Sequence, residues 1–186
     1  MKHTPSHAKS RSTPFGSLRV MILAALLAAI SIVCGKYLAI PGGNVMRFSF
    51  ENLPVLLGGI AFGPLVGAAI GALADLCGSV MVGYEINPII TLGAASIGLI
   101  SGSLFRITRR LSLSARLLVC VIASHLVGSV VIKTLGLSAF FALPLWELML
   151  LRLVNYLIVG ALEYFVLRIL LRNHAIRTQL GLHGLN

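Results

Sequence analysis

Acidic residues are scarce in this sequence: it has 5 Asp and Glu against 15 Lys and Arg, and charged residues occupy only 11% of the 186 positions. Soluble domains carry about a quarter charged residues, so this composition excludes an ordinary water-soluble fold. Hydrophobic residues instead reach 58%. They gather in runs of roughly 20 residues, long enough to cross a bilayer core of about 30 Å as helices. The sequence therefore predicts an all-α protein that crosses the membrane several times.

Motifs of catalysis and cofactor binding are also missing. The sequence has no Asp or His pair at metal-ligand spacing, no G-x-S-x-G and no Walker lysine. Its three cysteines, Cys34, Cys77 and Cys120, lie in apolar runs and are typical of small core residues. The net charge of +10 is divided among tails and short connections, which indicates membrane topology and no nucleic-acid partner. We therefore expect neither an enzyme nor a cofactor, and a lipid bilayer as the surroundings.

Six membrane spans are expected, at residues 18–38, 52–62, 65–81, 88–105, 115–135 and 145–171. The second is too short to cross alone. Gly63-Pro64 is a turn pair, which predicts that the second and third spans form a helical hairpin. The expected organisation is a disordered basic tail at 1–17, a six-helix transmembrane domain at 18–172 and a C-terminal tail at 173–186.

Basic residues are distributed unevenly between the two ends of the spans. With six spans, the N-terminal tail, the connection between the fourth and fifth spans, and the C-terminal end share one side. That side carries Lys2, Lys9, Arg11, Arg19, Arg106, Arg109, Arg110, Arg116, Arg168, Arg172 and Arg177. Because the cytoplasmic side of a membrane protein carries the excess of Lys and Arg, both termini are expected in the cytoplasm of a cell-membrane protein.

Charged groups of both signs gather at the opposite ends of the spans. They are Lys36, Arg47, Lys133 and Arg152 with Glu51, Glu85 and Glu147, and the polar or aromatic residues Tyr84, Asn87 and Trp146 lie near them. Any single one could be an interfacial residue that reaches toward water. A group of both signs in so apolar a chain instead favours a polar cavity that opens to the outside.

Some of these side chains have the chemistry to hold an aromatic, anionic ligand. Glu85 and Asn87 precede Pro88, a suitable first-turn residue of the fourth span. Arg152 and Asn155 are three residues apart and share a helix face. A carboxylate can accept N–H groups of a heterocycle, and an arginine can bind a carboxylate through two parallel hydrogen bonds. Flat surfaces for a ring are available at Phe48, Tyr84 and Trp146.

Small residues in the first span occur at four-residue spacing. Ala24 and Ala28 form one pair and Ala25 and Ala29 another, so each pair lies on one helix face. Small residues at this spacing let a second helix approach closely. The pairs are therefore candidates for a docking surface.

A glycine stripe in the third span leads to an acid. Gly63, Gly67 and Gly71 recur at four-residue steps and indicate close packing on a neighbouring helix. Asp75 follows, about 16 Å beyond Pro64 at a rise of ~1.5 Å per residue. We interpret it as a structural acid that helps lock the hairpin below the cavity. The alternative is a self-sufficient secondary transporter, with Asp75 and Glu163 in a proton path.

Most of the chain, from about Ala24 to Arg172, resembles the substrate-binding S components of energy-coupling factor (ECF) vitamin transporters, particularly the folate family. The resemblance rests on the alanine pairs of the first span and on two longer blocks. These are RFSFENLPVLLGGIAFGPLVGAAIGALAD at 47–75 and GYEINPIITLGAASIGLISG at 83–102. It implies a six-helix bundle with an outward-facing vitamin pocket, a membrane scaffold subunit and two cytoplasmic ATPases as partners.

The resemblance also implies roles for particular segments. The alanine pairs would dock on the scaffold, and the loop at 39–49 would cover the pocket. For folate, Glu85 would face the pterin edge, and the cations would face the glutamate carboxylates. Pantothenate and hydroxymethylpyrimidine are the alternative cargoes. The residues expected to bind the ligand are Lys36, Arg47, Glu51, Tyr84, Glu85, Asn87, Lys133, Trp146, Arg152 and Asn155.

Overall fold

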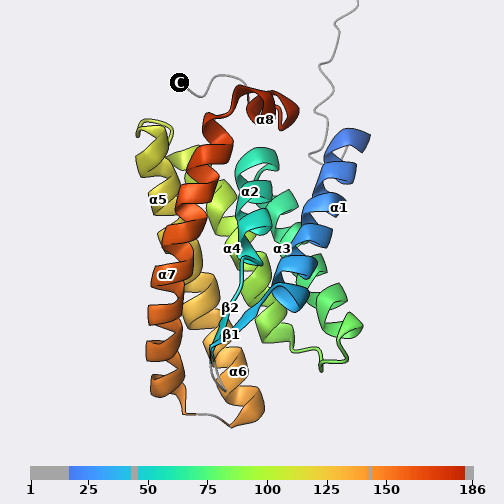
Figure 1. Cartoon of the computed structure of the whole chain (residues 1–186), viewed down its shortest axis with the longest axis vertical. Coiled ribbons are helices and arrows are strands. Elements are labelled where there is room, and N and C mark those ends of the chain that lie inside the picture. Colours follow the sequence, from blue (N-terminus) through green and yellow to red (C-terminus); the bar gives the residue numbers. More distant parts are fainter. Residues whose placement is uncertain (1–16, 43–45, 143, 183–186) are drawn as a thin grey trace, which may run out of the picture.

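The computed structural model describes residues 17–42, 46–142 and 144–182, and its helices form one upright bundle (Figure 1). Its elements are α1 (Leu18–Ile32), η1 (Val33–Tyr37), β1 (Ile40–Gly42), β2 (Met46–Phe48), α2 (Asn52–Phe62), α3 (Pro64–Met81), α4 (Pro88–Ile107), α5 (Leu113–Ser124), η2 (His125–Ile132), α6 (Lys133–Phe141), α7 (Leu145–Arg172) and α8 (His174–Gln179). The expected tail at 1–17 lies almost wholly outside the described residues. The C-terminal tail begins with a short helix, α8.

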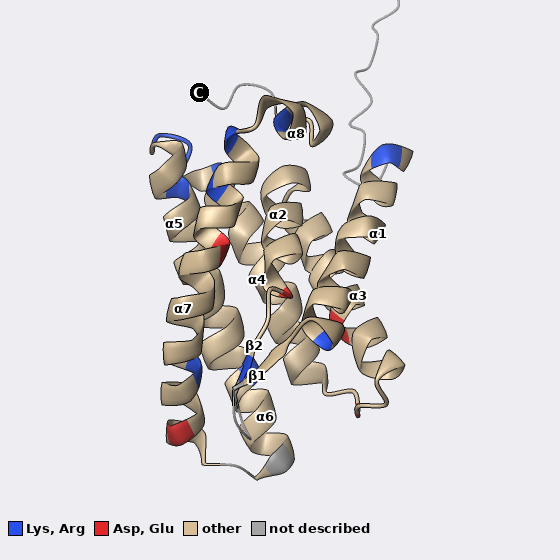
Figure 2. Cartoon of the chain, viewed as in Figure 1, with Lys and Arg blue, Asp and Glu red and all other residues tan. Residues whose placement is uncertain are grey.

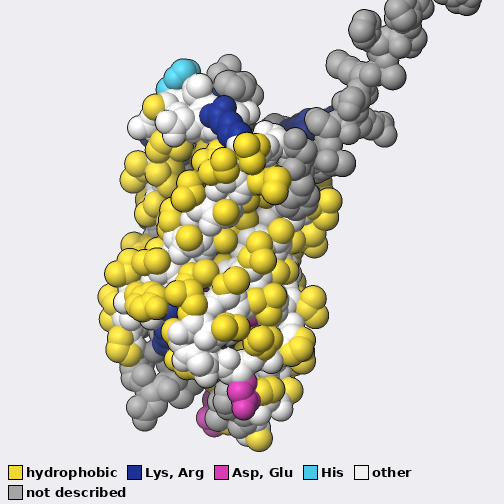
Figure 3. Space-filling view, turned by 90° about the vertical axis from the view of Figure 1, so that its right-hand side faces the viewer, with side chains coloured by type: hydrophobic (Ala, Val, Ile, Leu, Met, Phe, Trp, Pro, Cys, Tyr) yellow, Lys and Arg dark blue, Asp and Glu magenta, His cyan; other side chains and the backbone are white. Residues whose placement is uncertain are grey.

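The described part of the chain holds five helical segments that are long and apolar enough to cross a membrane. One of them, Leu113–Phe140, is built from α5, the π-helical η2 and α6 in continuous succession. The sixth pass is α2, which has 11 residues and is the short helix expected from the sequence. Apolar side chains cover the face seen in Figure 3 between its two ends. The all-helical membrane architecture predicted from the sequence is confirmed.

The beginning of α1 and the helix α8 lie at the same end of the bundle (Figure 1). Arg19 connects them, because its Nη2 donates to the backbone oxygen of Gln179 at 2.7 Å. Basic residues are abundant at this end, on α1, α5, α7 and α8 (Figure 2). We call it the terminal end of the bundle. An even number of passes, with α2 counted, brings both described chain ends there.

Glycines allow α2, α3 and α4 to pack with their backbones in contact. Gly63 has φ +101° and ends α2, and Pro64 begins α3, so the expected turn and hairpin are present. A Cβ at Gly67 would lie 2.5 Å from Gly59 Cα and 2.7 Å from the carbonyl oxygen of Gly98. A Cβ at Gly71 would collide with the Ala94 backbone of α4. The stripe thus packs α3 against both neighbours.

Adding a single methyl group at this contact is expected to destabilise the bundle. Gly67→Ala should lower the free energy of unfolding by about 1–3 kcal/mol, because backbone atoms must move to make room. The thermal midpoint of the detergent-purified protein measures this loss. Val80→Ile is the control, since it also adds one carbon to α3 but at a position that is 65% exposed. Equal midpoints for both variants would contradict the close contact.

The apolar core lies in the terminal half of the bundle. Its fully buried side chains come from α2, α3, α4, α5 and α7, and include Leu56, Ile70, Ile97, Leu117 and Leu167. The opposite half is less completely filled by apolar side chains. Here β1 and β2 form an antiparallel ribbon that pairs Ile40 with Phe48. This ribbon occupies the segment expected to be a covering loop, although 43–45 lie outside the described residues.

Candidate functional site

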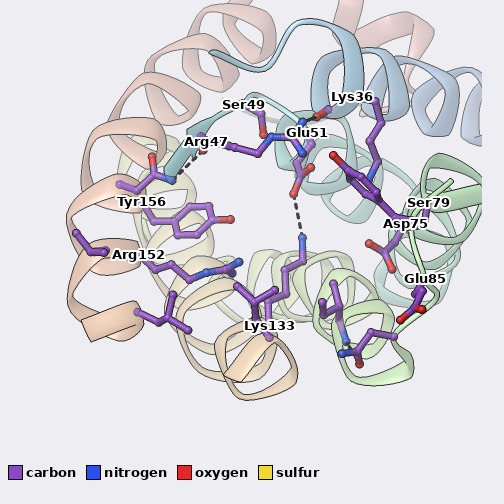
Figure 4. Close-up of a pocket in the computed structure, with 18 of the residues that line it drawn as sticks. Lys36, Arg47, Ser49, Glu51, Asp75, Ser79, Glu85, Lys133, Arg152 and Tyr156 are labelled. Carbon is purple, nitrogen blue, oxygen red and sulfur yellow. Dashed lines mark hydrogen bonds and ion pairs between the residues drawn. The ribbon is translucent and has the colours of Figure 1, made fainter. Parts of the chain in front are cut away.

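A cavity of about 560 Å³ lies in the half of the bundle away from the terminal end. Its volume falls in the range of small-molecule sites. Its walls come from η1, β2 and the residues after it, α3 with the following connection, α6 and α7. The polar or charged lining residues are Lys36, Arg47, Ser49, Glu51, Asp75, Ser79, Tyr84, Glu85, Asn87, Lys133, Arg152, Asn155 and Tyr156 (Figure 4).

An ion pair crosses the cavity between α6 and the start of α2. Lys133 Nζ donates to Glu51 Oε1 at 3.1 Å, and Ser31 Oγ donates to the Glu51 backbone oxygen at 2.6 Å. Glu51 precedes α2. The Lys133 ammonium, outweighing the effect of burial, lowers the pKa of the Glu51 carboxyl from 4.5 to about 2. Glu51 is therefore ionised at any physiological pH. The ion pair links α6 to the start of α2, and the Ser31 hydrogen bond adds α1.

Because the pKa of Glu51 is lowered in the folded protein, the contribution of Glu51 to stability depends on pH. The contribution of ionised Glu51 is complete above its ordinary pKa of 4.5 and is lost as the pH falls toward about 2. The thermal midpoint of the unaltered chain should thus exceed that of Glu51→Gln by a constant amount from pH 8 to about pH 5.5. Below 4.5 the difference should shrink. The control is Glu147→Gln, which changes an exposed acid. A difference that persists undiminished at pH 3 would contradict the ion pair.

Two guanidinium groups form one side of the cavity. Arg47 of β2 donates from Nη2 to the Gly35 carbonyl at 2.8 Å, and Arg152 of α7 donates from Nη1 to the Ser129 carbonyl at 3.2 Å. Asn155 Nδ2 donates to the backbone oxygen of Arg47 at 3.0 Å, which fastens the ribbon to α7. Neither arginine has a carboxylate within ion-pair distance among the described residues. Each guanidinium therefore keeps N–H donors available for an anionic ligand.

The carboxylates of Asp75 and Glu85 lie on the other side (Figure 4). Asp75 Oδ2 accepts a hydrogen bond from Thr91 Oγ1 at 2.7 Å, which links α3 to α4. Ser79 follows one helical turn later and also lines the cavity. Glu85 is exposed in the connection between α3 and α4. Acceptors thus face the cavity from one wall and guanidinium donors from the opposite wall.

Other lining residues hold the wall together. Asn87 Oδ1 accepts from the backbone nitrogens of Ile89 at 2.9 Å and Ile90 at 3.4 Å, and so caps α4. Asn87 Nδ2 donates to the Gly136 carbonyl at 2.9 Å. Its amide is thus engaged in joining α4 to α6. Lys36 Nζ lies 5.2 Å from the ring centroid of Tyr84 and covers that ring from above.

Nine of the ten residues expected to bind a ligand line this single cavity. The exception is Trp146, which is 75% exposed at the start of α7. It precedes Arg152 by six residues, or about 240° around a helix at about 100° per residue, so it lies on a different face. Sequence reasoning missed the polar lining residues Ser49, Ser79 and Tyr156. Ser79 and Tyr156 each follow a recognised polar residue by four positions, a helical spacing that was a usable signal.

The position of Asp75 differs from the one expected. It was expected below the cavity as a lock between the second and third spans. Its carboxylate instead lines the cavity, and its hydrogen bond runs from α3 to α4. The expectation misplaced it because depth along a helix does not reveal how far a cavity reaches into the bundle.

A second polar group lies outside the cavity, between η2 and α7. His125 Nε2 and Glu163 Oε2 are 2.5 Å apart, and both residues are buried. His125 Nδ1 lies 3.3 Å from Ser129 Oγ, and the Tyr156 ring stacks on the imidazole at 4.9 Å. Within the described ranges, no three His, Cys, Asp or Glu residues are placed to hold a metal ion.

The family profile described as "ECF transporter, substrate-specific component" matches residues 19–176. The chain belongs to this family. It is therefore a multi-pass transport subunit that binds a vitamin substrate and works with an ECF module, and it is not an enzyme. The alternative of a self-sufficient secondary transporter is not supported. Glu163, which that alternative required, does not line the cavity.

Two solved structures share the fold of this one. A structure of FolT bound with folic acid has a TM-score of 0.66 at 22% identity, over 81% of this chain and 90% of that chain. The S component of a bacterial ECF transporter has a TM-score of 0.63 at 18% identity, over 83% of this chain and 96% of that chain. At these identities the likeness establishes the fold alone. No curated protein sequence matches the chain.

The alanine pairs of this S component point in different directions. Ala28 is only 8% exposed, and Ala24 packs against the same core. Ala25 and Ala29 are exposed on the outer surface of α1. The geometry therefore leaves the second pair, and not the first, free to contact another helix.

Proposed function

We propose that this S component binds a folate-type vitamin in the cavity described above and passes it to an ECF module for ATP-driven import. The observation that carries the proposal is the separation of charge within one cavity. Asp75 and Glu85 lie on one side, and Arg47 and Arg152 lie on the other (Figure 4). A folate has N–H donors on its pterin ring at one end and carboxylates at the other, which matches this order.

Each end of such a ligand finds a suitable partner. Asp75 has one oxygen engaged by Thr91, and its other oxygen accepts no hydrogen bond from the described residues, so it can take N–H groups of a pterin. The two guanidinium groups can bind the glutamate carboxylates. Tyr156 points into the space between the two walls and offers a ring face (Figure 4).

The alternative vitamins use only half of this arrangement. Pantothenate has a carboxylate but lacks a heterocycle, and hydroxymethylpyrimidine has a heterocycle but lacks a carboxylate. Seven charged side chains line the cavity, with four cations against three acids. Their net charge of +1 (4 − 3) favours an anionic cargo. The structural likeness to FolT with bound folic acid agrees with the same choice.

The test is binding by the purified chain alone. Folic acid should quench the fluorescence of the protein and titrate to a stoichiometry of one. Pantothenate and hydroxymethylpyrimidine should fail to compete at equal concentration. Mass spectrometry of the small molecule released from freshly purified protein provides an independent answer. Release of a different vitamin, together with no response to folic acid, would overturn the choice of substrate and leave the subunit type intact.

Partners and orientation belong to the same proposal. The partners are a membrane scaffold subunit and two cytoplasmic ATPases, and the terminal end of the bundle faces the cytoplasm, since it carries most of the basic residues. In a cysteine-free background, Glu85→Cys should react with an impermeant maleimide added outside cells, and Arg177→Cys should react only after the cells are opened. The reverse pattern would invert the topology.

A further inference from the structure

A groove on the outer surface lies between α5 with η2 on one side and α7 on the other. Its volume is about 290 Å³, and it is separate from the ligand cavity, with which it shares only Tyr156. Its rim consists of large apolar side chains with 39–66% exposure: Leu118, Ile122, Leu126, Leu153, Leu157 and Phe165. All six belong to segments that span the membrane, so the groove faces the hydrocarbon region.

The floor of the groove is apolar although it contains a histidine. Both nitrogens of His125 are engaged, by Glu163 and by Ser129, and its ring stacks on Tyr156. What His125 presents near Gly160 is its Cδ2 carbon, which would lie 3.3 Å from a Cβ on that glycine. The groove is deep here because Gly160 has no side chain. The imidazole thus offers no free hydrogen-bonding group to an occupant, and Glu163 is fully buried and does not line the groove.

Two arginines on α7 lie beyond the groove, toward the terminal end of the bundle. Along α7 the lining residues Ala161 and Phe165 are followed at helical spacing by Arg168 and Arg172. Neither arginine has an acid within ion-pair distance in the described part of the chain. At ~1.5 Å per residue along α7, the lining residues from Phe165 to Leu153 lie about 4 Å to about 22 Å below Arg168. The length of the groove is thus close to the depth of one leaflet, which is half of a core of about 30 Å.

We propose that this groove binds one acyl chain of an anionic phospholipid from the leaflet at the terminal end, with its phosphate held by Arg168 and Arg172. An alkyl chain fits a narrow apolar groove of leaflet depth, and arginines at its end match an anionic head group. A transmembrane helix of a partner would require small residues for close approach. Such residues are exposed on α1, at Ala25 and Ala29, and the rim of this groove is formed by bulky side chains instead.

The experiment compares phosphatidylglycerol with phosphatidylcholine of the same acyl chains, added to the full chain in detergent. Native mass spectrometry should detect one retained phosphatidylglycerol, and that lipid should raise the thermal midpoint more than phosphatidylcholine does. Ala161→Phe, which fills the groove, should abolish retention of both lipids. Arg168→Gln with Arg172→Gln should remove the preference for phosphatidylglycerol and reduce its retention to the level of phosphatidylcholine.

Two control variants separate groove effects from general ones. Leu162→Phe enlarges an α7 side chain outside the groove, and Arg106→Gln removes a charge from α4, so both should retain the lipid as the unaltered chain does. If Ala161→Phe yields no monodisperse protein, Ala161→Leu replaces it. Equal retention of the two lipids by the unaltered chain, retention unaffected by filling the groove, or a second copy of the chain there would each overturn the proposal.

Discussion

Replacing Arg152 with alanine is expected to weaken folic acid binding by about 30- to 5000-fold without preventing membrane insertion. Arg152 lines the cavity from α7 and has no carboxylate partner among the described residues, so a bound carboxylate would be its counter-ion. Truncating one partner of a buried charged hydrogen bond typically costs about 2–5 kcal/mol, because the other charge is left unpaired. The dissociation constant is measured by fluorescence quenching or calorimetry on the purified variant.

A second arginine serves as the matched control. Arg110→Ala removes the same side chain from an exposed position in the connection between α4 and α5 and should leave affinity unchanged. Asp75→Asn tests the opposite wall. It should weaken binding of the pterin end, since an amide replaces one acceptor oxygen with a donor. Unchanged affinity in a correctly folded Arg152→Ala protein would remove this wall from the site.

Replacing Ala25 with tryptophan is expected to abolish vitamin uptake in cells while leaving ligand binding by the isolated protein intact. Ala25 and Ala29 lie exposed on α1, where small side chains permit a second helix to approach closely. A bulky side chain would hold that helix away. Uptake of radiolabelled folic acid with a co-expressed ECF module gives one measurement, and fluorescence titration of the purified variant gives the other.

The other alanine pair should respond differently. Ala28→Leu places three extra carbons at a position only 8% exposed in the core, so the yield of folded protein should fall along with uptake. Leu99→Trp adds bulk to an exposed site on α4 and should affect neither measurement. If Ala25→Trp supports normal uptake, this face of α1 does not dock on the module.

The helices could be predicted from the sequence because each depends on local apolar runs and turn residues. The break at Gly63-Pro64 and the short α2 are examples. The pairing of β1 with β2 could not, since three-residue strands carry little pattern and pair only when α1 and α2 have been placed. The same limit applied to Asp75, because its contact with the cavity depends on how α6 and α7 pack in the bundle.

Much of the candidate site was accessible to prediction for a different reason. An apolar chain can carry Lys36, Arg47 or Arg152 only where water, a partner or a ligand meets the charge, so scarcity made these residues conspicuous. Trp146 lacked this constraint, because Trp is common at membrane–water interfaces whether or not a ligand site is nearby. Counting about 100° per residue from Arg152 along the helix places Tyr156 near the same face and Trp146 on a different face. This count would have removed Trp146 from the expected site and added Tyr156.

The pairing of His125 with Glu163 has a consequence for the order in which the protein is made. Translation runs from the N-terminus, so His125 on η2 is synthesised before its carboxylate partner, Glu163 on α7. Glu163 then enters with the last long helix, and both groups are buried in the finished bundle. A polar residue in hydrocarbon is costly until it finds its counterpart. During biogenesis, insertion of α7 therefore supplies the hydrogen-bonding partner that the imidazole of His125 lacks until then.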